Sequence, residues 1–117
     1  MSTKTQVLHT SPGGEKLILV QFVTTAAFAY NGTNYYTIEL RVLRSGATYY
    51  STIGSLLSLA TRSLVANEKI DLFGSRRVPA SLQLNYGDAL IGVMANAGAP
   101  ALLANPSFVV EVQSQVR

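Results

Sequence analysis

The 117-residue sequence has no cysteine and only one histidine, and these two absences exclude several kinds of site. Without cysteine, the chain has neither a disulfide framework nor a thiolate metal site. The single histidine, His9, rules out metal sites built from histidine clusters and most histidine-dependent catalysis. We therefore expect no metal, no cofactor and no small-molecule substrate, and we expect that the protein is not an enzyme.

Long apolar runs are also missing. No run reaches the roughly 18 residues that a membrane-spanning helix requires. The first residues are polar, a pattern unlike that of a signal peptide. From these features we expect no membrane partner and synthesis in the cytoplasm.

Charge is scarce, at 13% of residues against about 25% in a typical soluble domain. Serine, threonine, asparagine and glutamine take its place, with thirty-two residues between them. Protein interfaces are depleted in lysine and acidic residues and enriched in tyrosine and arginine. This chain has six tyrosines and six arginines but three lysines. Two compatible interpretations follow: a small β protein with a neutral polar surface, or a subunit that other proteins cover.

The net charge of +3 does not indicate nucleic-acid binding, because the basic residues are scattered. Only Arg76 and Arg77 are adjacent, and no basic stretch contains interleaved aromatic residues. We expect no nucleic-acid partner. A positive surface would instead favour the approach of an acidic protein.

Alternating and apolar runs predict strands. Residues 36–42 and 107–113 alternate between apolar and polar side chains, as in half-buried strands. The run 16–23 is apolar and β-branched, which favours a strand buried on both faces. Shorter runs predict further strands at 5–10, 48–52, 62–66, 69–73, 82–85 and 89–95.

Turn signals separate these runs. Residues 12–14 break the chain, and Asn31-Gly32 and Ser45-Gly46 predict tight hairpins. Asp88 follows Gly87 and is expected to shape a turn. The segment 54–67 is ambiguous between an amphipathic helix and an irregular or one-turn helical segment followed by a short strand, and we favour the second. Another helical turn is possible at 101–103.

About eight short strands with close turn signals predict an all-β fold, an antiparallel β-sandwich of jelly roll-like or Greek key type. Residues 1–11 would form an N-terminal arm or an edge strand. Residues 12–117 would form a single domain, because the sequence contains neither a linker nor a repeat.

Candidate interface residues come from exposed aromatic, arginine and loop positions. Neighbouring residues on a strand face opposite sides, so one member of Tyr35-Tyr36 and of Tyr49-Tyr50 should face outward, and we choose Tyr35. A cross-strand pair of Tyr30 and Tyr35 on a wet sheet face explains these two residues equally well. The candidate interface residues are Tyr30, Tyr35, Tyr49, Arg76, Arg77, Leu102 and Leu103.

The last four of these lie in predicted loops. Arg76 and Arg77 could bind carboxylates of a partner, although a solvated loop tip is the commoner outcome. Leu102 and Leu103 belong to the uncharged loop 97–104, which would be a liability if it were left in water.

The order of these motifs carries a resemblance. A Pro-Gly-Gly-Glu-Lys turn at 12–16 precedes an apolar strand, the two hairpin signals follow, and 82–90 reads as strand, Gly-Asp turn and strand. The chain resembles the small β-sandwich virion proteins of tailed bacteriophages, especially the capsid decoration (cement) proteins.

This resemblance implies a structural protein of the virion that binds the major capsid protein on the capsid exterior and stabilises the shell. It also implies a homo-oligomer, a dimer or a trimer, with residues 1–10 as an attachment arm. Two alternatives stay open: a phage tail or fibre module, and a glycan-binding β-sandwich that stacks sugars on tyrosines.

Overall fold

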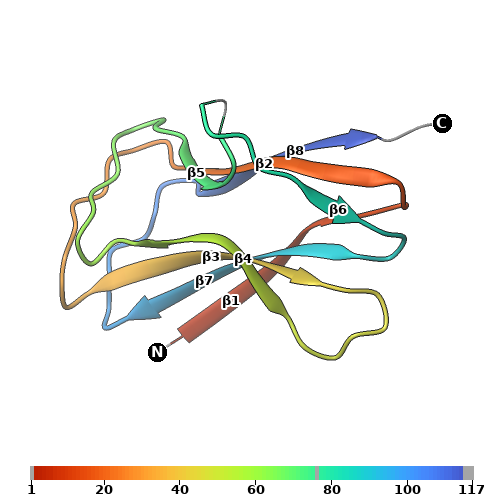
Figure 1. The fold of residues 1–117 in the computed structure, drawn as a ribbon. Coiled ribbons are helices and arrows are strands. Elements are labelled where there is room, and N and C mark those ends of the chain that lie inside the picture. Colours follow the sequence, from red (N-terminus) through yellow and green to blue (C-terminus); the bar gives the residue numbers. More distant parts are fainter. Residues whose placement is uncertain (1, 76, 115–117) are drawn as a thin grey trace.

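Strands account for all the regular structure of the described residues, 2–75 and 77–114, in the computed structural model (Figure 1). None of these residues is helical. The strands are β1 (Ser2–Thr10), β2 (Glu15–Val23), β3 (Tyr35–Leu43), β4 (Ser51–Ser58), β5 (Ile70–Phe73), β6 (Leu82–Leu84), β7 (Ala89–Ala97) and β8 (Ser107–Ser114).

The strands form two antiparallel sheets that pack face to face. The first sheet has the order β1-β7-β3-β4. In the second sheet β2 is central, with β8 along one side and β5 and β6 along the other. The expected antiparallel β-sandwich is therefore confirmed. Residues Ser2–Thr10 are paired along β7, so they form an edge strand.

The hydrophobic core lies between the sheets. In β3 the predicted alternation is observed: Tyr36, Ile38 and Leu40 are buried, whereas the residues between them are half-buried. In β8 the alternation is also as predicted. The central strand β2 alternates only in part, because the neighbours Leu19 and Val20 are both buried. Its predicted burial on both faces is therefore observed at Leu19, while Ile18, Gln21 and Val23 are half-buried.

The predicted Asn31-Gly32 hairpin is wrong. The strands on either side of it, β2 and β3, belong to different sheets, so the segment 24–34 crosses between the sheets instead of folding back. Neither Asn31 nor Gly32 has a positive φ. The Asn31 side-chain oxygen instead accepts the backbone N–H groups of Thr33 and Asn34, each at 2.8 Å.

The ambiguous segment 54–67 begins as strand and not as helix. Strand β4 runs over Ser51–Ser58, later in the chain than the expected 48–52. The expected strand at 62–66 is reduced to one bridge between Leu64 and Phe28. Residues 101–103 have no regular structure, so the possible helical turn there is absent.

The two long sides of the sandwich differ. On one side Gly54, in a bulge of β4, approaches the Leu72 backbone so closely that an added Cβ would collide with the Leu72 carbonyl. This contact brings β4 onto β5. On the other side β1 and β8 lie near each other but do not pair within the described residues. We call the gap between β1 and β8 the seam.

Candidate functional site

The loops between strands gather at the two ends of the molecule, which measures 48 × 33 × 21 Å (Figure 1). At one end lie the segments 24–34 and 98–106, which contain no charged residue. Hydrogen bonds hold them together, among them Thr25 N to Ala104 O (2.9 Å) and Ala99 N to Asn34 Oδ1 (2.9 Å). Tyr36 Oη, from β3, donates another to Ala101 O (3.0 Å). We call these two segments the apolar end.

The opposite end is built from the segments 44–50 and 85–88, which we call the tyrosine end. Its centre is the carboxylate of Asp88, which is 2% exposed. This carboxylate accepts the backbone N–H groups of Ser45 (3.0 Å) and Asn85 (2.8 Å) and an N–H of Arg44 (2.6 Å). Asp88 therefore shapes its turn, as the sequence predicted, and also holds a second turn against it.

The electrostatics of this end follow from these contacts. Burial raises the pKa of Asp88, but the hydrogen bonds from Ser45, Asn85 and Arg44 outweigh burial and lower it below its ordinary value. The carboxylate stays ionised and paired with Arg44. The tyrosine end therefore presents no unpaired charge.

The three most exposed large hydrophobic side chains of the described residues lie at these two ends. Leu102 is 92% exposed at the apolar end, while Tyr86 and Tyr49 are 78% and 73% exposed at the tyrosine end. Exposed tyrosines are typical anchors of protein interfaces, and exposed apolar groups that cluster often mark interaction sites. The two ends are therefore the candidate interaction surfaces.

The structure separates the residues that the sequence singled out. Tyr30, Leu102 and Leu103 belong to the apolar end, where Leu103 packs partly against the core. Tyr35 begins β3 beside this end and is half-buried, with Tyr36 as the core member of the pair. Since the hairpin is absent, Tyr30 and Tyr35 do not form the cross-strand pair that was the alternative.

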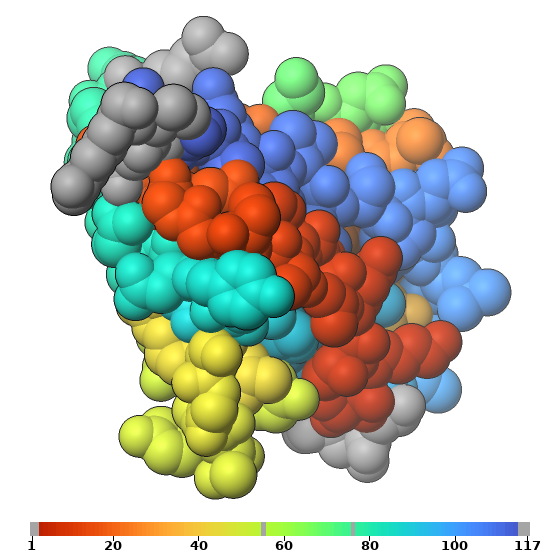
Figure 2. Space-filling model, turned by 90° about the vertical axis from the view of Figure 1, so that its right-hand side faces the viewer, coloured from red at the N-terminus to blue at the C-terminus, as the bar shows by residue number. Residues whose placement is uncertain are grey.

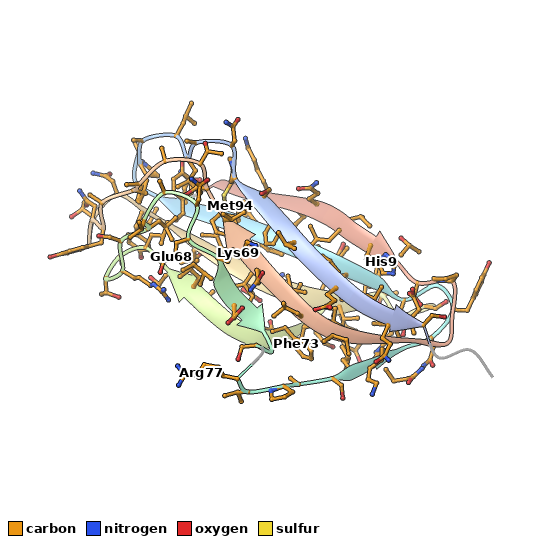
Figure 3. The ribbon with its side chains drawn as sticks, turned by 90° about the horizontal axis from the view of Figure 1, so that it is seen from above. His9, Glu68, Lys69, Phe73, Arg77 and Met94 are labelled. Carbon is orange, nitrogen blue, oxygen red and sulfur yellow. The ribbon has the colours of Figure 1, made fainter. Side chains whose placement is uncertain are left out.

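Tyr49 lies at the tyrosine end, and its neighbour Tyr50 is exposed too. The prediction that only one of them faces outward is wrong, because both precede β4 and lie in a loop where strand alternation does not apply. Arg77 is exposed on the loop between β5 and β6, apart from the loops that form the two ends (Figure 3). Arg76 lies outside the described residues.

Among the described residues, three ion pairs and one histidine–carboxylate hydrogen bond involve many of the few charged side chains, and these partners could not be inferred from the sequence. They join His9 to Glu15 (2.8 Å), Arg41 to Glu39 (2.7 Å), Arg44 to Asp88 (2.6 Å) and Arg62 to Glu68 (3.2 Å). The hydrogen bond from His9 lowers the pKa of Glu15, and that from Arg41 lowers the pKa of Glu39. Internal pairing therefore makes a charge-poor surface still more neutral.

The described residues contain no group of three histidine, aspartate or glutamate side chains that could hold a metal ion. No helix in the described part of the chain could span a membrane. No protein-family model, curated protein or solved structure matches this chain.

Proposed function

We propose that this protein is a structural virion subunit, a decoration protein that binds the outside of a phage capsid and stabilises the shell. One observation carries this proposal: the three most exposed large hydrophobic side chains of the described residues lie at the two ends of the molecule, in loops that contain no unpaired charge. A subunit with two such ends can contact two neighbours at once. The β-sandwich and the resemblance in turn order support the same function.

The proposed mechanism is bridging by many copies. Each end would bury an anchor, Leu102 at the apolar end and Tyr49 or Tyr86 at the tyrosine end, against a shell protein. Modest affinity at each end suffices, because binding at one end raises the effective concentration at the other. A dimer or trimer of the chain would multiply these contacts.

The test is to add purified protein to capsids from which it is missing. We expect saturable binding, with hundreds of copies per particle, and a shell that releases its contents at a higher temperature. Leu102→Ser should weaken binding about ten-fold, as expected for loss of an interface anchor. Val78→Ser, a similarly exposed position on the loop between β5 and β6, is the matched control. Absence of saturable binding would rule the proposal out, and about a dozen copies per particle would favour a tail or fibre module.

A second candidate function is glycan binding, which the exposure of Tyr49, Tyr50 and Tyr86 at one end favours. Aromatic faces can stack on sugar rings. Binding to a glycan array that Tyr49→Ala abolishes, together with no affinity for capsids, would select this function over shell binding.

A further inference from the structure

The free edge of β1 is long and lightly protected. Strand β1 pairs with β7 on one side, and within the described residues no strand pairs with its other side. From Ser2 to Val7 the pairing with β7 is regular, and a bulge interrupts it only between Val7 and His9. An edge of this kind presents backbone N–H and C=O groups that another strand can bind. Lys4 is the single charged residue in this stretch.

An apolar groove lies directly beside this edge, in the seam. A cavity of about 330 Å³ is bounded by residues 4–6 of β1, by Gly92 and Met94 of β7, and by Phe22 and Phe108 of the opposite sheet. The rings of Phe22 and Phe108 meet edge to face, with centroids 5.3 Å apart. Gly92 makes room for this packing, because a Cβ there would lie 2.9 Å from the Phe108 ring. The floor of the groove is therefore aromatic.

The groove continues toward the apolar end. A second cavity of about 470 Å³ shares Lys4, Met94 and Pro106 with the first and reaches Leu102 and Leu103. Figure 3 shows Met94 on the same side of the molecule as the loops of this end. Figure 2 shows β1, in red, crossing one face of the molecule beside the blue segments that include β8. The edge and the groove thus form one surface that is continuous with the apolar end.

The chemistry of this surface selects its occupant. A strand added to β1 would point alternate side chains into the groove, so its backbone would supply affinity and its apolar residues specificity. Lys4 is the one charged residue that lines either cavity, and it forms no ion pair within the described residues. An acidic side chain facing Lys4 would complement this charge.

We propose that the seam between β1 and β8 is a strand-acceptor site. It binds an extended segment of a partner protein that alternates apolar with polar residues and carries an acidic side chain opposite Lys4. This inference rests on the proposed function, because it names the chemistry of the docking segment, but it is tested without capsids.

The test measures binding of a labelled nine-residue peptide to the whole chain by fluorescence anisotropy. The peptide alternates valine with threonine and has glutamate at its centre. We expect Lys4→Glu to weaken binding of this peptide about ten-fold, as a reversed interfacial charge does. A peptide with lysine at its centre should bind the Lys4→Glu variant with the original affinity. Lys69→Glu makes the same charge change away from the groove and should leave binding unchanged. A peptide with two prolines, which cannot pair as a strand, should not bind.

Amide hydrogen exchange locates the bound peptide. We expect slower exchange of the amides of 2–7 in the complex. Unchanged exchange there, equal binding of the proline peptide, or equal losses in Lys4→Glu and Lys69→Glu would each overturn the proposal. Protection of β1 that grows with protein concentration and without peptide would assign the edge to a second copy of the chain. If the peptide does not bind but decanoate binds the groove saturably, the proposal is overturned and the groove is assigned to a small amphiphile.

Capsid binding separates this proposal from the function on which it rests. If peptides fail to bind but capsids bind the protein saturably, the strand-acceptor site is wrong and the proposed function stands. If peptides bind as expected but capsids do not, the acceptor site stands and its partner lies elsewhere.

Discussion

At the scale of single residues, Asp88 contributes most to the order of one end of the molecule. Its carboxylate joins the turn before β4 to the turn before β7 through Ser45, Asn85 and Arg44. We expect Asp88→Asn to lower the free energy of unfolding by about 2–3 kcal/mol, since the amide loses hydrogen bonds to a charged group. Urea denaturation should show a lower midpoint with an unchanged slope.

Asp71→Asn is the control for this substitution. The Asp71 carboxylate is exposed and accepts one hydrogen bond, from Gln21 at 2.8 Å. A surface change of this kind should alter the free energy of unfolding by no more than about 0.5 kcal/mol. Equal effects of the two substitutions would contradict the role given to Asp88.

The lowered carboxyl pKa values predict how stability depends on pH. Glu15 and Asp88 titrate below their ordinary values of 4.5 and 3.8 in the folded chain. In the acid range the unfolded chain therefore binds more protons than the folded chain, and stability falls as pH falls. We expect full stability above about pH 5 and a progressive loss below it. Urea denaturation at each pH should show a shallower loss in Asp88→Asn than in the unsubstituted chain.

At the scale of elements, the bulge in β4 closes one side of the sandwich. Gly54 has a φ of +73° and lies against the carbonyl of Leu72, whereas Gly46 has a φ of +81° and no atom within 4 Å of an added Cβ. Gly46→Ala should therefore cost about 1 kcal/mol, from backbone strain alone. Gly54→Ala should cost clearly more, because β4 and β5 must also separate. If thermal unfolding shows the same loss of stability in Gly46→Ala and Gly54→Ala, the contact between Gly54 and β5 contributes nothing to stability.

The elements that the sequence predicted well are those whose side chains report burial directly. In β3 and β8 the period-two pattern is strong because one face of each strand meets the core. The turn at 12–14 was also predictable, since Gly13 and Gly14 both adopt positive φ. The Asn31-Gly32 hairpin failed because turn propensity is local, whereas the sheet to which each flanking strand belongs depends on contacts across the whole chain.

Long-range partners explain what the sequence could not predict about the candidate site. The tyrosine end exists because Gly87 and Asp88 contact Ser45, which places the turn that contains Tyr86 against the loop that carries Tyr49 and Tyr50. Tyr86 precedes the predicted Gly87-Asp88 turn, and its exposure has no local signal in the sequence. The neutral composition of the loop 97–104 is visible in the sequence and makes Leu102 and Leu103 candidate interface residues. Leu102 is exposed whereas Leu103 packs partly against the core, and their role at an interface stays a prediction.

At the scale of the whole molecule, the scarcity of charge and the placement of apolar side chains point the same way. A free monomer usually keeps a charged, mixed surface, which opposes association. Here ion pairs neutralise several of the charged side chains, and large apolar groups stand at both ends of the long axis. Such a molecule is suited to linking neighbours, provided that both ends are used at once.

Simultaneous use of both ends can be tested by disabling one end at a time. If the protein bridges two shell subunits, Leu102→Ser and Tyr49→Ser should each leave saturable binding, at about ten-fold lower affinity, through the intact end. Stabilisation of the shell against heat should nevertheless be lost in both variants even at full occupancy, because a subunit held at one end transmits no force between neighbours. Val78→Ser should keep both properties. A variant that stabilises the shell fully when one end is disabled would mean that the protein acts through a single contact, and the second end would then need another partner.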